Sequence, residues 1–460
     1  MRSRRQKKET LEFASLWKPT LALLLLLIIS LQSVAIAIPS SSSSYEGTTL
    51  PLYHSSTLAQ GSRGSHGSSI AAFESQKETT STQPTTEDAT ELSGGIFTSM
   101  GVGNPVQNMA LRVDTASAIT WVQCVQEGQI DRSEDYPGRE KMQPHFVTAA
   151  STTLKPLPCT QNPPNCPYGA ACEADSLCHY NASYGDGKHS DGVLHTDRIR
   201  FGDDDPEGPA LLLRDALIGC SNPNTTTVLA DGVLALGAGP DSLPSKYNMA
   251  PFSYCVPPSF NYEGFLTLNT TLNISANATS VPFTHNPAHP SLYYLSLVHI
   301  GVGGSILPLP NTSFLVSSNG HGGTILDVGT PIAKFEATIH SALIDAFKPA
   351  LANLTLVPGG ANGYDTCFFH PTIDESDPDD IYLNTPTLDL PTIDLHFDNG
   401  SVLAVHDVNT LVHVGWNKTC LAFHAAAPGA TSILGANLQQ GFKITVDLPS
   451  NLIHFEENSC

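Results

Sequence analysis

One short pattern occurs twice in this sequence: an apolar run ends in Asp, and small or hydroxylated residues follow at once. The copies lie at residues 110–117 (ALRVDTAS) and 323–330 (GTILDVGT). Each copy predicts a β-strand that stops on a carboxylate, and an apolar stretch ending in Gly follows each of them later in the chain. The repetition predicts two homologous lobes. If the lobes face each other, Asp114 and Asp327 meet.

Two carboxyl groups within hydrogen-bonding distance cannot both stay ionised, so they share a proton and their apparent pKa values separate. The ionised member can take a proton from water while the protonated member polarises a carbonyl group. Activation of water and polarisation of the carbonyl group together allow peptide hydrolysis without a metal ion or a covalent nucleophile.

Further motifs resemble those of the pepsin-type aspartic endopeptidases, and most closely their plant nepenthesin-like branch. The motifs follow in the order of that family, from about residue 96 to residue 460. A lone Asp-Thr-x-Ser is a weak signal, whereas the ordered set is specific. The set consists of GVGNP at 101–105, DTAS at 114–117, WVQC at 121–124, YGDG at 184–187, DGVLALG at 231–237, FSYC at 252–255, DVGT at 327–330 and ILGAN at 433–437.

The resemblance implies an all-β fold of two pepsin-like lobes with the active-site cleft between them, and Asp114 and Asp327 as the catalytic residues. We expect a first lobe at residues 95–256, with a Cys-rich insert, and a second lobe at residues 257–460. Gly and Pro residues punctuate the chain as in many short strands. The best helix candidate is short, around residues 339–351.

The resemblance also implies a flap that closes over the substrate. Tyr184, Gly185 and Asp186 form the tip of a predicted β-hairpin, with Tyr184 near Trp121. Such a lid excludes water and positions a peptide. The alternative interpretation of the same residues is an ordinary surface hairpin.

Three loop residues complete the predicted substrate-binding set: Ser117, Gly329 and Thr330. The hydroxyls of Ser117 and Thr330 lie three residues after each Asp, where they can donate to its outer oxygen and hold it in place. Either hydroxyl is equally compatible with a generic turn residue.

Two positions depart from the family's loops. Ala116 replaces the first Gly, and its methyl group is expected to crowd the pair of carboxyl groups. Val328 replaces a hydroxyl residue that in the family ties one loop to the other. A buried partner left unpaired costs about 1–3 kcal/mol, which predicts reduced rather than abolished activity.

Composition narrows the class of partner. The formal net charge is −21, which argues against nucleic acid or an anionic membrane as partner and suits an acidic compartment. We expect a monomer that acts on a protein or peptide substrate, with no cofactor and no metal ion. The pair His285 and His289 is the nearest approach to a metal site, but it lies in a Pro-rich stretch rather than on a helix.

The N-terminus predicts a secretory signal. A basic start precedes an apolar stretch at residues 21–31, and Ala35-x-Ala37 fits a cleavage site, giving a signal peptide over residues 1–37. A retained signal anchor is the alternative, and only then would the protein contact a membrane. Residues 38–94 are Ser/Thr-rich and read as a disordered or loosely docked pro-segment or linker.

The cysteines and glycosylation sequons fit the secretory route. All ten cysteines are available to pair, and disulfides are favoured over metal binding. By resemblance we expect Cys367 to pair with Cys420 and Cys255 with Cys460; the other pairings stay open. The nine Asn-x-Ser/Thr sequons begin at residues 181, 224, 269, 273, 277, 311, 353, 399 and 417.

These observations favour a secreted or vacuolar aspartic endopeptidase that works at acidic pH. The alternative is a weakly active or silent protein on the same fold that binds or inhibits another protein, because fold alone does not establish activity.

Overall fold

The duplication visible in the sequence recurs in the pairing of the strands. The strands that carry Asp114 and lead to Asp327, β3 and β18, each run parallel to the apolar strand that ends near a Gly, β11 and β27. The next strands, β4 and β19, run antiparallel to β11 and β27, and each pairs in parallel with one more strand, β10 or β26. The bounds are β3 Gln107–Asp114, β4 Trp121–Val125, β10 Leu211–Ser221, β11 Gly232–Ala235, β18 Thr324–Leu326, β19 Ala333–Glu336, β26 Phe423–Ala426 and β27 Ser432–Leu434.

This computed structural model describes residues 47–54, 95–125, 145–160, 165–185, 187–202, 210–222, 231–257, 263–361, 363–369, 390–414, 418–457 and 459. Most of the elements in it are strands, and the prediction of an all-β fold with two lobes is confirmed. In these described ranges no helix is long and apolar enough to cross a membrane.

A central sheet joins the two lobes. Its strands are ordered β1, β13, β12, β28, β29, β14, and its middle pair, β12 with β28, brings together segments almost two hundred residues apart, such as Phe252 and Val446. The pairing is again duplicated, since the hairpin of β12 and β13 matches that of β28 and β29. The bounds are β1 Thr48–His54, β12 Phe252–Cys255, β13 Gly264–Leu268, β14 Thr279–Asn286, β28 Phe442–Asp447 and β29 Leu452–Glu457.

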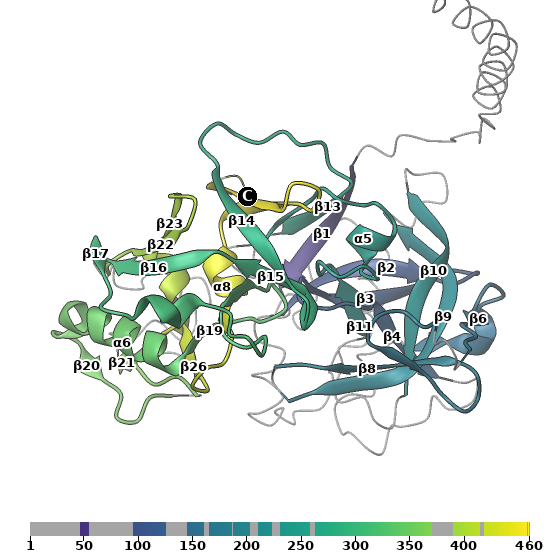
Figure 1. Cartoon of the computed structure of the whole chain (residues 1–460), viewed down its shortest axis with the longest axis horizontal. Coiled ribbons are helices and arrows are strands. Elements are labelled where there is room, and N and C mark those ends of the chain that lie inside the picture. Colours follow the sequence, from purple (N-terminus) through teal and green to yellow (C-terminus); the bar gives the residue numbers. More distant parts are fainter. Residues whose placement is uncertain are drawn as a thin grey trace, which may run out of the picture. The chain divides into compact units, whose positions relative to one another are not determined.

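Strand β1 departs from the sequence prediction. It lies within the segment expected to be disordered or loosely docked, yet it pairs with β13 over five residues and with the start of β2 (Ile96–Val102). Figure 1 shows β1 in purple beside β13. Leu50 and Leu52 are buried. β1 holds the place in the first half that β14 holds in the second, because β14 pairs with β29 and then with β15 (His289–Leu295).

The predicted short helix is present as α6, Ala337–Leu351. The Glu336 carboxylate accepts the backbone N–H of Thr338 at 2.8 Å and caps the first turn. Residues spaced by four, Ile339, Leu343, Phe347 and Leu351, are buried and fix the helix on its sheet.

The remaining elements flank these sheets. In the first lobe they are β5 Phe146–Val147, β6 Lys155–Pro156, β7 Ala170–Cys172, β8 Cys178–Ser183, β9 His189–Phe201 and α5 Leu243–Lys246. In the second they are β16 Leu297–Val302, β17 Ser305–Ile306, β20 Thr355–Leu356, β21 Cys367–Phe369, β22 Ile393–Phe397, β23 Val402–Val405, β24 Leu411–His413, β25 Lys418–Leu421 and α8 Ala436–Gln439.

Disulfide bonds cross-link the Cys-rich insert, residues 159–178, and each of the two lobes. The predicted pair Cys367 with Cys420 is confirmed and joins directly opposed residues of β21 and β25. Cys255 is also disulfide-bonded, but its predicted partner Cys460 lies outside the described residues. The other three bridges are Cys124–Cys220, Cys159–Cys172 and Cys166–Cys178.

Candidate active site

In each repeated loop the main chain of the Asp residue is hydrogen-bonded to the neighbouring parallel strand. The peptide carbonyl of Asp114 accepts the N–H of Leu236 at 2.8 Å, and the N–H of Asp327 donates to the carbonyl of Leu434 at 3.2 Å. The neighbouring parallel strand therefore fixes the main chain of each Asp. Both side chains are buried, with 4% and 6% of each residue exposed.

Each carboxylate receives a backbone N–H from two residues further on. Ala116 donates to Oδ1 of Asp114 and Gly329 donates to Oδ1 of Asp327, both at 2.8 Å. The second oxygen of Asp327 accepts the Thr330 hydroxyl at 2.6 Å, as the sequence predicts.

The matching prediction for Ser117 does not hold. Its hydroxyl hydrogen-bonds with the hydroxyl of Tyr184 in the flap rather than with Asp114. The second oxygen of Asp114 instead faces the guanidinium of Arg112, at 3.9 Å. The two carboxyl groups thus have different surroundings, which suits different protonation states for the two.

Thr115 joins the loops to each other. Its hydroxyl donates to the carbonyl of Leu326 at 3.4 Å and accepts the N–H of Val328 at 3.0 Å. Val328 is fully buried and, lacking a hydroxyl, cannot return such a bond. The contact from Thr115 of the first loop to the second loop is therefore present, whereas residue 328 of the second loop cannot make the corresponding contact to the first.

The two loops also come into close contact at Gly329. A methyl group on Gly329 would stand 2.6 Å from Cγ of Asp114. Neither Gly329 nor Ala116 has a positive φ, so close approach rather than backbone conformation demands the glycine. Half-buried Ala116 shows that the first loop accepts a methyl group in its own place.

The carboxyl groups of Asp114 and Asp327 interact electrostatically. Burial, together with the nearby charge of Asp114, raises the pKa of Asp327 to about 7, although the bonds from Thr330 and Gly329 oppose the rise. Asp327 can accordingly hold a proton across the acidic range, at pH values at which exposed carboxyl groups have lost theirs.

The predicted hairpin is present between β8 and β9, and Tyr184 lies beside Trp121. Tyr184 follows β8, its N–H donates to the carbonyl of Lys188, and the Trp121 indole N–H donates to its hydroxyl at 2.7 Å. Burial, and then the charge of Asp114, raises the pKa of the Tyr184 hydroxyl. Gly185 is exposed and a side chain there would touch nothing within 4 Å. Asp186 lies outside the described residues.

Two residues of this site escaped the sequence prediction. Thr115 belongs to the quoted motif, but no local pattern reveals that its hydroxyl crosses to the other loop. Arg112 lies two residues before Asp114, and the alternation of a β-strand is the signal that places both side chains on one face.

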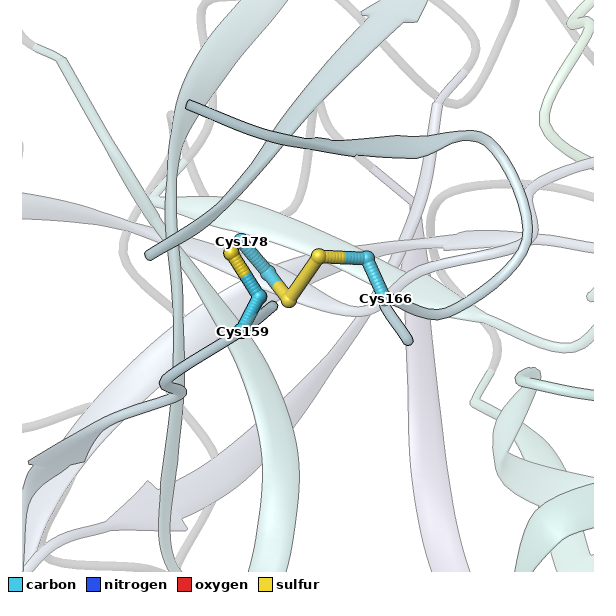
Figure 2. A group of neighbouring side chains, drawn as sticks. All are labelled: Cys159, Cys166 and Cys178. Atoms are coloured by element: carbon cyan, nitrogen blue, oxygen red, sulfur yellow. A yellow bond between two sulfur atoms is a disulfide. The ribbon is translucent and has the colours of Figure 1, made fainter. Parts of the chain in front are cut away.

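Three sulfur atoms form a cluster of metal-like spacing among the described residues, those of Cys159, Cys166 and Cys178. Figure 2 shows that Cys166 and Cys178 are bonded to each other, and Cys159 is bonded to Cys172. Because disulfide sulfurs carry no thiolate charge, this cluster does not suit a metal ion. The ring Nε2 of His285 is paired with Oδ1 of Asn451 at 3.0 Å.

Comparison with known proteins gives two matching family models and several curated relatives. The models are described as xylanase inhibitor N-terminal, matching residues 97–268, and xylanase inhibitor C-terminal, matching residues 292–457. Aspartyl protease family protein 2 of Arabidopsis thaliana is 31% identical over 80% of this chain and 71% of its own length. Aspartic proteinase nepenthesin-1 of Nepenthes gracilis is 27% identical over 80% of this chain and 78% of its own.

Solved structures share the fold. The structure of edgp has a TM-score of 0.63 at 18% identity and covers 90% of this chain and 95% of its own. Basic 7S globulin from soybean has a TM-score of 0.60 at 18% identity, covering 89% of this chain and 96% of its own.

Proposed function

Because the chain belongs to the pepsin-like aspartic protease family, we propose that it is an aspartic endopeptidase that hydrolyses peptide bonds at acidic pH. The observation that carries this proposal is the pair Asp114 and Asp327: two buried carboxyl groups on matching loops, and the contacts of Gly329 and Thr115 hold these loops together. The raised pKa of Asp327 fits the member that keeps a proton.

In the proposed reaction a water molecule lies between the two carboxyl groups. Ionised Asp114 takes a proton from the water, whose oxygen bonds to the carbonyl carbon of the substrate. Protonated Asp327 gives its proton to the carbonyl oxygen. When the tetrahedral intermediate collapses, the amide nitrogen takes the proton held by Asp114 and the C–N bond breaks. One hydroxyl of the intermediate returns its proton to Asp327 as the new carbonyl group forms, which restores both carboxyl groups to their starting states. Closure of the flap over the peptide keeps bulk water out.

We propose further that the protein acts as a monomer in the secretory pathway, outside the cell or in the vacuole, after loss of a signal peptide and processing of a pro-segment. Its disulfides and its acidity support this route. Among the residues that the structure describes, six sequon asparagines are exposed and accessible to glycosylation: Asn181, Asn273, Asn277, Asn311, Asn353 and Asn399.

A second candidate is a weakly active or silent module that binds or inhibits another protein. Val328 supports it, since one loop has lost the hydroxyl that would return the contact of Thr115. The descriptions of the two matching family models support it as well, and point to a xylanase as the partner to test.

Digestion of casein or haemoglobin between pH 3 and pH 7 separates the two candidates. We expect cleavage that a statine-type analogue blocks, that Asp114→Asn and Asp327→Asn abolish, and that Asp231→Asn retains. Asp231 is the matched control because it is equally buried but binds the N–H of Ala110. Full activity of Asp327→Asn contradicts the proposal. An inert wild type that binds a xylanase favours the second candidate.

A further inference from the structure

The proposed reaction leaves one half-buried charge beside the two Asp residues without a role, that of Arg112. Its guanidinium lies 3.9 Å from Oδ2 of Asp114, and its carbon stands 5.0 Å from the centre of the Tyr184 ring. The Arg112 side chain is 15% exposed, against 6% for Asp114. The chain has 43 acidic residues against 22 Lys and Arg, so a basic composition does not account for an arginine at this position.

The contacts of Arg112 leave hydrogen-bonding capacity free. A guanidinium carries five N–H donors in a planar fork. A single long contact to Asp114 is not the bidentate geometry in which Arg and carboxylate pair most strongly. Among the described residues its buried Nε has no hydrogen-bond partner. An unpaired buried donor is unfavourable, so the protein does not satisfy this side chain by itself, and the terminal N–H groups are the ones that an incoming acceptor can use.

A bound peptide would bring such an acceptor. Its scissile carbonyl must lie at Asp114 and Asp327, and the flap residue Tyr184 covers it. Because Arg112 contacts both Asp114 and Tyr184, a substrate side chain next to the scissile bond would come close to its guanidinium.

We propose that Arg112 forms a subsite that selects an acidic side chain, Glu or Asp, next to the scissile bond. The proposal rests on the endopeptidase function for the place of the peptide. A carboxylate there can take the donors that Asp114 leaves unused, in a site with little water to compete. Asp114 and Tyr184 are the titratable groups in contact with Arg112. The charge of Arg112 also interacts electrostatically with Asp327 on the opposite loop.

The test compares peptides that differ only by Glu or Gln at one position, placed in turn on either side of the scissile bond. For one of these positions we expect kcat/KM to favour Glu about tenfold or more at pH 5–6. The preference should vanish near pH 3, where the substrate carboxyl is protonated. Arg112→Met should remove the preference, and Arg112→Lys should keep part of it. Ratios within one variant cancel any general loss of rate.

A binding measurement keeps this inference separate from the proposed activity. Calorimetry with a pair of uncleavable statine peptides, one with Glu and one with Gln, needs no turnover. Tighter binding of the Glu peptide to wild type but not to Arg112→Met supports the subsite even if no peptide is cleaved. Equal handling of Glu and Gln by wild type at pH 5–6 overturns it, as does a Glu preference that survives in Arg112→Met.

Discussion

Gly329 stands against the carboxyl group of Asp114: a methyl group on Gly329 would lie 2.6 Å from Cγ and 2.8 Å from Oδ2. Contacts this short do not occur for real side chains, so Gly329→Ala must move Asp114 or the loop. Since a displacement of about 1 Å can slow catalysis roughly 100-fold, we expect kcat to fall by about that factor with a smaller change in KM. Steady-state kinetics at acidic pH measure this.

The matched control is Ala116→Gly, the same position in the first loop. It removes a methyl group that the loop already accommodates, so kcat should not fall. Equal loss of activity in both variants would show that loop flexibility, rather than the contact with Asp114, explains the effect of Gly329→Ala.

Thr115 gives the second prediction. Its hydroxyl bonds to Leu326 and Val328 of the other loop, so Thr115→Val leaves two buried backbone groups unpaired. We expect the free energy of unfolding to drop by about 1–3 kcal/mol. Urea titration checks the value, and an unchanged midpoint would contradict it.

Two substitutions, one in each loop, restore the residues typical of the family. Val328→Ser combined with Ala116→Gly restores the hydroxyl and the glycine of the family's loops, so kcat should rise more than KM changes, because these contacts orient the catalytic groups. The two positions can couple, so the double variant need not equal the sum of the singles. A double variant no faster than wild type means that the loops have already compensated.

The hydroxyls of Thr330 and Ser117 should have separable effects. The bond from Thr330 lowers the pKa of Asp327, so Thr330→Val should raise that pKa and extend activity to higher pH, while lowering kcat. Ser117 contacts the flap, so Ser117→Ala should change KM and leave the pH limits in place. Identical pH–rate profiles for wild type and Thr330→Val would exclude this role.

Asp231 makes the stability of the fold depend on pH. Burial raises its pKa to about 7, whereas an unfolded Asp ionises near pH 4. The free energy of unfolding is therefore unaffected by the raised pKa of Asp231 below about pH 4, and it decreases as the pH rises toward 7, because the unfolded state loses this proton first. Asp231→Asn, which can still accept the N–H of Ala110, should match wild type at pH 4 and exceed it at pH 7.5, by on the order of 2–4 kcal/mol. Denaturation of both proteins at pH 4 and at pH 7.5 measures this difference in the free energy of unfolding.

Strand β1 supplies the last prediction. Leu50 is 2% exposed in the sheet it shares with β13, so Leu50→Ala should cost about 2–5 kcal/mol. Thr49, on the exposed side of the same strand, is the control, and Thr49→Ala should cost less than about 1 kcal/mol. Equal, small effects would mean that β1 adds little to the stability of the central sheet.

Local sequence patterns were sufficient for much of the fold and part of the site. The repeated run ending in Asp predicted the strands β3 and β18 and two matching lobes, because each strand and its turn are encoded by neighbouring residues. The same holds for α6, for the hairpin at Tyr184, and for the bond of Thr330 to Asp327, which spans only three residues.

Tertiary structure decided the rest, because it depends on contacts between residues far apart in the chain. The alternation of Leu50 and Leu52 is too short a signal within a Ser/Thr-rich segment, and β1 becomes a strand only because β13, more than two hundred residues later, offers it an edge. No spacing reveals that Ser117 turns to the flap or that Arg112 faces its ring. Those partners were fixed when the lobes and the flap packed together, which lies beyond the reach of any local pattern.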